Sequence, residues 1–182
     1  MLKSDKYKFI FIAIPKTGTR SIIDLCKKRF NAEIDFKNSH SRIAPSNYND
    51  YYKFTVVRNP YDRVVSMWKS TTQRNNGDRY GFKSIMDSEN SFKSFCRKIL
   101  KTKNLIVQPQ NYWLSKNTFN QILRFENLNE DWNSLPFNIE NFKLPHINKT
   151  NHNHYSEYYD KETIQIVQEK YAEDIEFFGY EF

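Results

Sequence analysis

Cysteine and glycine are both scarce in this chain of 182 residues. Cys26 and Cys96 are the only two cysteines, too few for a disulfide framework or a four-cysteine zinc site. We expect both thiols to be free and buried, which fits a reducing compartment. No glycine precedes Gly18. Because the Walker A loop of nucleotide-binding proteins needs a glycine ahead of its lysine, that motif is excluded at the start of the chain.

Long hydrophobic runs are absent as well. Residues 9–14 form an apolar run that is far too short to span a bilayer, and Pro15 and Lys16 end it. Residues 1–8 are polar and charged, with no signal-peptide core of adequate length behind them. We therefore expect a cytoplasmic protein without an integral membrane segment, unless an anchor has been removed from it.

Acidic residues are outnumbered by basic ones, 21 against 28, which gives a formal net charge of +7. A basic surplus of this size favours an anionic partner, and nucleic acid, a nucleotide, an acidic glycan or a membrane surface all qualify. The hydrophobic fraction of 38% is enough for a folded core rather than a disordered tail. The length suits one domain, residues 1–182.

The stretch around which the chain is organised begins with the apolar residues 9–14, which are typical of a buried strand. A short polar loop with Gly18 follows, and a helical pattern then runs to Phe30. Thr19 or Ser21 is expected to cap that helix. A loop of this kind brings backbone N–H groups and a helix N-terminus to one point, which predicts a phosphate site. An ordinary strand-to-helix turn remains the alternative at this stage.

A second strand and helix meet at Arg58. Residues 54–57 are predicted to form a buried strand, Asn59 to cap the next helix, and Pro60 to occupy its first position. A third core strand is predicted over residues 120–125, with Glu126 just after it. Alternating strands and helices predict an α/β fold with a parallel sheet, whose carboxyl edge is the usual place for ligands.

Two further helices are predicted with capping residues at their starts. Ser91 is expected to cap a helix that runs to Leu100, and Asp160 is expected to cap the last helix. The apolar face of that last helix consists of Ile164, Val167, Tyr171 and Ile175.

These motifs together resemble those of sulfotransferases that use 3′-phosphoadenosine 5′-phosphosulfate (PAPS). Residues 15–21, Pro-Lys-Thr-Gly-Thr-Arg-Ser, resemble the loop that binds the 5′-phosphosulfate. Residues 57–66, Val-Arg-Asn-Pro-Tyr-Asp-Arg-Val-Val-Ser, resemble the strand and helix that bind the 3′-phosphate. Residues 123–128, 145–155 and 171–180 are similar to segments of carbohydrate sulfotransferases and their bacterial relatives. The resemblance therefore covers nearly the whole chain.

The resemblance implies a P-loop-like three-layer fold, in which helices flank a central parallel sheet. It also implies a donor site without a required metal, and 3′,5′-ADP as the product. Lys16 would stabilise the leaving phosphate during transfer, which is mostly positioning and charge stabilisation. The implied donor-binding residues are Lys16, Thr17, Gly18, Thr19, Arg20, Ser21, Arg58, Ser66 and Lys149.

The acceptor hydroxyl needs a base, and the resemblance favours His40. Glu126 is the next candidate because it ends a core strand at the carboxyl edge, and Asp62 and His146 are further rivals. The resemblance also implies a carbohydrate or glycoconjugate acceptor. We expect the cytoplasmic protein to act beside a membrane where glycoconjugates are made. The sequence leaves the acceptor's identity and the oligomeric state open.

Two other functions compete with sulfuryl transfer. A small P-loop-like kinase needs a Walker lysine, which is missing from its place. A nucleic-acid-binding domain needs exposed aromatic residues among basic ones. The aromatic residues here lie mostly at core spacing, so no nucleic-acid partner is predicted.

Overall fold

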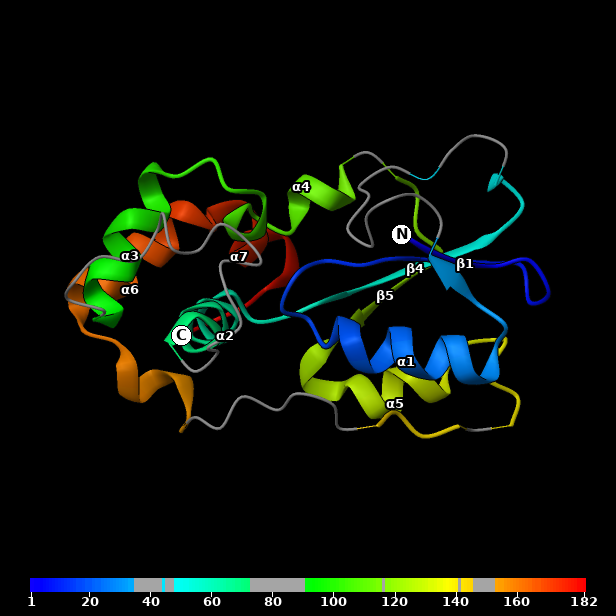
Figure 1. The fold of residues 1–182 in the computed structure, drawn as a ribbon. Coiled ribbons are helices and arrows are strands. Elements are labelled where there is room, and N and C mark those ends of the chain that lie inside the picture. Colours follow the sequence, from blue (N-terminus) through cyan, green and yellow to red (C-terminus); the bar gives the residue numbers. More distant parts are fainter. Residues whose placement is uncertain (35–43, 45–47, 73–90, 116, 141, 146–152) are drawn as a thin grey trace. The chain divides into compact units, whose positions relative to one another are not determined.

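The computed structural model describes residues 1–34, 44, 48–72, 91–115, 117–140, 142–145 and 153–182. In this part of the chain the strands are β1 (Leu2–Ser4), β2 (Phe9–Ile12), β3 (Glu33–Ile34), β4 (Tyr52–Val57) and β5 (Gln121–Arg124). The helices are α1 (Thr19–Arg29), α2 (Pro60–Thr72), α3 (Phe92–Lys101), α4 (Asn111–Leu114), α5 (Leu128–Asn133), α6 (Lys161–Lys170) and α7 (Ala172–Phe178). Figure 1 shows their course along the chain.

The contacts within the chain group it into two compact units. Residues 1–58 and 112–149 form the first, and residues 59–111 and 150–182 form the second. The first unit contains the sheet, and the second contains α2, α3, α6 and α7. A single sulfotransferase domain over residues 1–182 stays a prediction.

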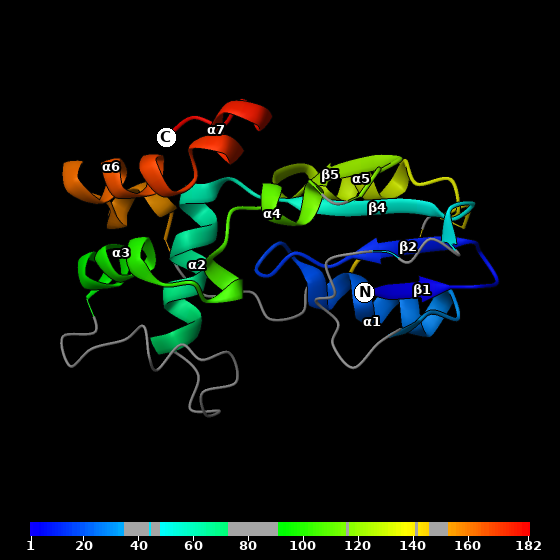
Figure 2. The same cartoon turned by 90° about the horizontal axis from the view of Figure 1, so that it is seen from above.

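The sheet of the first unit has the order β3-β1-β2-β4-β5, and Figure 2 shows its longer strands side by side. β2, β4 and β5 run parallel, whereas β1 pairs antiparallel with both β2 and β3. The prediction of a parallel sheet is therefore correct for the three core strands but wrong for the whole sheet, which is mixed. β1 was not predicted, because its three residues are too short to show a pattern. The P-loop-like three-layer arrangement stays a prediction.

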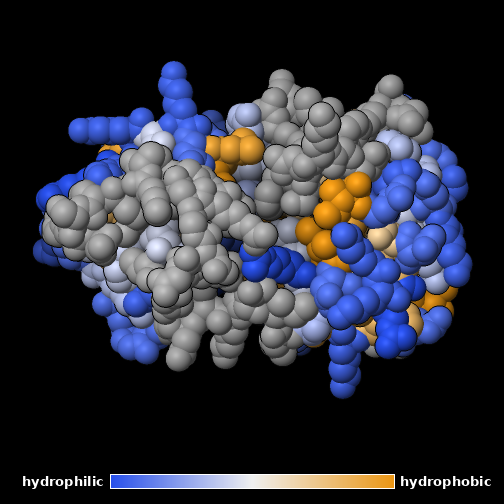
Figure 3. Space-filling view, viewed as in Figure 1, coloured by the Kyte–Doolittle hydropathy of each residue, from blue (hydrophilic) through white to orange (hydrophobic). Residues whose placement is uncertain are grey.

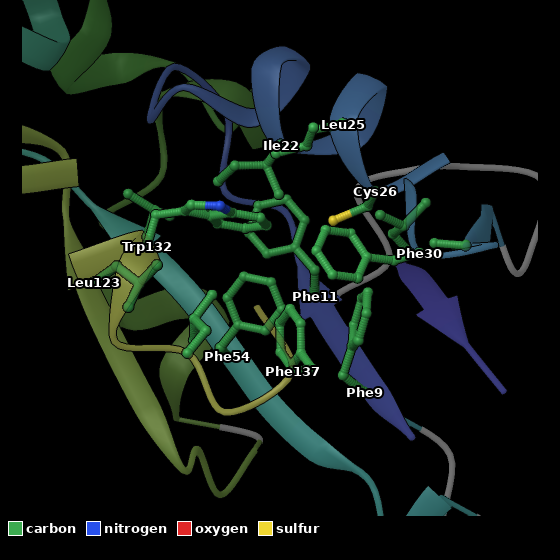
Figure 4. Close-up of a cluster of buried hydrophobic side chains, with 14 of the residues drawn as sticks. Phe9, Phe11, Ile22, Leu25, Cys26, Phe30, Phe54, Leu123, Trp132 and Phe137 are labelled. Atoms are coloured by element: carbon green, nitrogen blue, oxygen red, sulfur yellow. The ribbon is translucent and has the colours of Figure 1, made fainter. Parts of the chain in front are cut away.

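One face of this sheet packs against α1 and α5 around aromatic side chains (Figure 4). Alternate residues supply the sheet's side of the core, since successive side chains of a strand point to opposite faces. Those residues are Phe9, Phe11, Ala13, Phe54, Val56 and Leu123. Cys26 of α1 lies among them as a free thiol, and burial raises its pKa well above the ordinary value. This packing fixes where α1 begins relative to the ends of the strands.

The second unit has a hydrophobic core of its own, formed mainly by α2, α3 and α6. Two buried charged residues hold its loops. The guanidinium of Arg63, fully buried, donates to the carbonyls of Ile106 (2.9 Å) and Gln108 (3.0 Å). Burial raises the pKa of Asp174, whose carboxylate accepts the backbone N–H groups of Gln110 and Asn111.

Helix starts in the second unit follow the sequence closely. The Ser91 hydroxyl accepts the N–H of Ser94 at the start of α3, and Asp160 forms a capping box with Thr163 at α6. The last helix, expected to run on to Ile175, is instead interrupted at Tyr171. The fully buried Tyr171 donates its hydroxyl to the carbonyl of Val107, a long-range contact that periodicity cannot reveal.

Candidate active site

The carboxyl ends of β2, β4 and β5 lie at one edge of the sheet, because these neighbouring strands run parallel. The loop into α1 follows β2, Arg58 follows β4, and a 3₁₀ turn (Phe125–Asn127) follows β5. The structure thus gathers three of the predicted site segments within the first unit.

Two residues of the loop after β2 have left-handed backbone conformations. Lys16 has φ 72° and Gly18 has φ 80°. For a residue with a side chain this costs roughly 1–2 kcal/mol, so Lys16 needs support from its surroundings. The hydroxyls of Thr17 and Thr19 both donate to the carbonyl of Ile14, at 3.0 and 2.7 Å. These bonds brace the loop; the predicted role of both threonines in binding the donor stays a prediction.

Gly18 has both a conformational and a spatial reason to be glycine. Its φ of 80° is one that side chains rarely adopt, and a Cβ here would lie 3.1 Å from Leu128 Cδ2 and 3.2 Å from the Phe125 ring. The turn therefore packs directly against the segment that follows β5.

Helix α1 starts with Gly18 at its N-cap, without a capping side chain. The expectation that Thr19 or Ser21 caps this helix is wrong, since Thr19 is its first helical residue and its hydroxyl is directed to Ile14. The first turn contains no acidic residue. The N-terminal end of a helix carries a partial positive charge that attracts anions, so this end favours a phosphate or sulfate group.

Arg58 is held from two sides and is only 6% exposed. Its Nη1 donates to the carbonyl of Lys16 at 3.1 Å, and its guanidinium carbon lies 4.1 Å from the centre of the Phe125 ring. Arginine carries five N–H donors in a rigid fork, so one bond to the loop is compatible with binding an anion as well. Lys16, Arg20 and Arg58 make this edge basic.

Residues 1–181 match a family model described as "Sulfotransferase family". The chain belongs to the sulfotransferase family. It matches no curated protein and no solved structure closely enough to name a relative. The protein is thus a sulfotransferase enzyme, and its family in general implies PAPS as the sulfuryl donor. The loop at α1 and the adjacent Arg58 suit a donor with phosphate groups.

Other predicted residues of the sulfotransferase site are less directly described. Glu126 is exposed in the turn after β5, at the same edge as Arg58. Ser66 is 3% exposed within α2 and belongs to the second unit. His40, His146 and Lys149 lie outside the described residues. The roles of all five stay predictions.

Phe125 lies at this edge of the sheet and was not singled out from the sequence. It contacts both the Arg58 guanidinium and the space beside Gly18. Its place immediately before Glu126, at the carboxyl end of a core strand, was the available signal.

Within the described residues of this sulfotransferase, no helix is long and apolar enough to cross a membrane. The same residues contain no group of three or more His, Cys, Asp or Glu side chains that could hold a metal ion. In the view of Figure 3, hydrophilic residues cover most of the described surface, and apolar residues form separate small patches.

Proposed function

We propose that this sulfotransferase transfers a sulfuryl group from PAPS to a hydroxyl of a carbohydrate or glycoconjugate. The observation that carries the donor assignment is the bond between Arg58 and the Lys16 carbonyl. It joins the loop predicted for the 5′-phosphosulfate to the arginine predicted for the 3′-phosphate. A donor with phosphates at both positions is what such a pair of neighbouring cationic groups would select.

Lys16, Arg20 and the first-turn N–H groups of α1 would bind the 5′-phosphosulfate, and Arg58, Ser66 and Lys149 the 3′-phosphate. Transfer breaks the bond between sulfur and the bridging oxygen and forms one between sulfur and the acceptor oxygen. The negative charge that develops on the leaving phosphate lies where Lys16 and the helix N-terminus can stabilise it. The acceptor proton passes to a base, and 3′,5′-ADP leaves.

Ligand-induced thermal stabilisation tests the donor assignment. A ligand at one hundred times its dissociation constant adds about 2.7 kcal/mol to the stability of the protein that binds it. We expect 3′,5′-ADP to raise the melting temperature by several degrees, and ATP with Mg²⁺ or an oligonucleotide to have little effect. Stabilisation by ATP with Mg²⁺ alone would favour a kinase, and stabilisation by the oligonucleotide alone would favour a nucleic-acid-binding domain.

His40 is the proposed base, and Glu126 is its rival. Removing a general base typically costs about 10²- to 10⁴-fold in rate. We expect His40→Ala to lose that much turnover while it still binds 3′,5′-ADP, and Glu126→Gln to stay near the wild-type rate. Near-normal turnover of His40→Ala with a large loss in Glu126→Gln would transfer the role to Glu126.

The acceptor class is tested by transfer from labelled PAPS to a panel of glycans, with phenols and simple alcohols as comparison acceptors. We expect label on glycan hydroxyls; label on the phenols alone would contradict a carbohydrate acceptor. The +7 net charge is compatible with glycans that already carry acidic groups. We also propose a cytoplasmic location beside the membrane, which cell fractionation would test.

A further inference from the structure

Phe125 contacts both halves of the proposed donor site. The guanidinium carbon of Arg58 lies 4.1 Å from the centre of the Phe125 ring. Its ring atoms Cδ2 and Cε2 would each lie 3.2 Å from a Cβ on residue 18. Leu128, one turn further along the chain, lies next to the same position, with its Cδ2 3.1 Å from a Cβ on residue 18. A single aromatic ring thus limits where the arginine and the glycine turn can lie.

The Arg58 guanidinium passes this constraint on to Lys16. Arg58 donates a hydrogen bond to the carbonyl of Lys16. This bond holds the backbone of Lys16, whose φ of 72° is unfavourable for a residue with a side chain. Without an acceptor or a ring to fix it, an arginine has many rotamers and loses them only at a cost in entropy. The ring therefore restricts the guanidinium before any ligand binds, and preorganisation of this kind raises affinity.

We propose that Phe125 is a positioning residue for the sulfuryl donor. It holds the Arg58 guanidinium so that one N–H donor supports the Lys16 peptide while the fork faces the 3′-phosphate. The inference rests on the proposed function, because it takes Arg58 as the ligand of that phosphate. Phe125 itself touches neither the donor nor the acceptor in this scheme.

The competing explanation is that Phe125 only fills space at the edge of the core, against which it packs. Phe125→Leu distinguishes the two, because leucine keeps apolar bulk beside Gly18 but offers no ring to the guanidinium. Phe142→Leu is the matched control. Phe142 is also partly buried against the same core and lies 5.1 Å from the guanidinium of Arg29, at the far end of α1.

The measurement is calorimetric binding of 3′,5′-ADP and of 5′-AMP, which lacks the 3′-phosphate. In Phe125→Leu we expect the affinity for 3′,5′-ADP to fall about tenfold, as loss of one buried cation–π contact predicts. The affinity for 5′-AMP should change less than about twofold, so selectivity for the bisphosphate falls. Phe125→Tyr keeps a ring and should restore selectivity, and Phe142→Leu should leave it at the wild-type value.

A double-mutant cycle with Arg58→Lys completes the test. Lysine has no planar fork to lie on the ring, so Phe125→Leu should weaken binding far less in the Arg58→Lys background than in the wild type. The inference about Phe125 would be overturned if Phe125→Leu kept the wild-type preference for 3′,5′-ADP over 5′-AMP, or if Phe125→Leu and Phe142→Leu lowered that preference equally. Neither result would contradict the proposed function. If the wild-type protein itself failed to prefer 3′,5′-ADP to 5′-AMP, the assignment of Arg58 to the 3′-phosphate would fall, and this inference with it.

Discussion

β2 and β4 are neighbouring parallel strands, and each leads into a helix through a short turn. The turn before α2 provides hydrogen bonding and charge for the start of its own helix. The Asn59 side-chain oxygen accepts the N–H of Tyr61 at 2.9 Å. Pro60 is the first helical residue, and Asp62 supplies a negative charge in the first turn. The turn before α1 has neither a capping side chain nor a first-turn acid. It has instead a strained lysine and a left-handed glycine.

The two turns differ in whether their own side chains stabilise the start of the helix that follows. Asn59 accepts an N–H group at the start of α2 that has no partner within the helix, and the negative charge of Asp62 offsets the partial positive charge of that helix end. α1 lacks both, and the chain tolerates the unfavourable backbone of Lys16 at its start. Strain of this kind persists where the surroundings hold it, and it is common at functional sites. The comparison therefore supports the proposal that the start of α1 binds the 5′-phosphosulfate, whereas Asn59 and Asp62 stabilise the start of α2.

The largest effect is expected at Lys16. Lys16→Met keeps the length of the side chain and removes its charge, so it should lower kcat for sulfuryl transfer by about 10²- to 10³-fold, as removal of one stabilising group typically does. Lys27→Met, an exposed lysine in the last turn of α1, is the control and should stay near the wild-type rate. Steady-state kinetics with labelled PAPS measures both; a kcat for Lys16→Met within threefold of wild type would contradict the proposed role.

A smaller effect is expected at the two left-handed glycines. Gly18→Ala and Gly179→Ala both place a side chain at positive φ, which costs roughly 1–2 kcal/mol. Only Gly18→Ala also meets neighbouring side chains, since no atom lies within 4 Å of a Cβ at residue 179. Overpacking adds about 1–3 kcal/mol. Urea denaturation should therefore show the larger destabilisation for Gly18→Ala, which should also bind 3′,5′-ADP more weakly; equal losses would refute the packing argument.

The smallest effect is expected at the turn before α2. Asn59→Ala removes a helix cap and should cost about 1 kcal/mol in the free energy of unfolding. Its affinity for 3′,5′-ADP should stay at the wild-type value, because the Asn59 side-chain oxygen is directed to the Tyr61 N–H and Asn59 has no proposed role in donor binding. Asn59→Ser keeps a capping oxygen but loses the bond that the Asn59 amide donates to the Glu181 carbonyl at 3.1 Å, so it should recover only part of the stability. A clear loss of 3′,5′-ADP affinity in Asn59→Ala would break the comparison.

Elements and caps that depend on nearby residues were predictable. The apolar run of β2, the asparagine–proline pair before α2 and the caps at Ser91 and Asp160 all carry their information within a few residues. The loop at Gly18 was also evident as a turn into a helix. Its N-cap was not, because the Thr19 hydroxyl could satisfy either its own helix or the carbonyl of Ile14, and the fold of the loop directs it to Ile14.

Contacts between distant segments could not be predicted. Nothing in residues 1–8 shows that β1 joins the sheet antiparallel to β2, because three residues give too little periodicity. Nor does the sequence show that Tyr171 interrupts the last helix. The packing of Phe125 against both Gly18 and Arg58 depends on the order of β2, β4 and β5 in the sheet, which local patterns leave open.

The sequence by itself determined the kind of chemistry: a lysine ahead of a single glycine at a helix start, and an arginine at the end of the next core strand, are typical of sulfotransferases. Such motifs are local, and the residue types alone carry their charge and hydrogen-bonding capacity. Only the tertiary structure decided how they combine. The parallel pairing of β2, β4 and β5 brings Arg58 to the Lys16 carbonyl and packs Phe125 against Arg58 and beside Gly18. Contacts across a sheet are set by strand order rather than by neighbours in the chain.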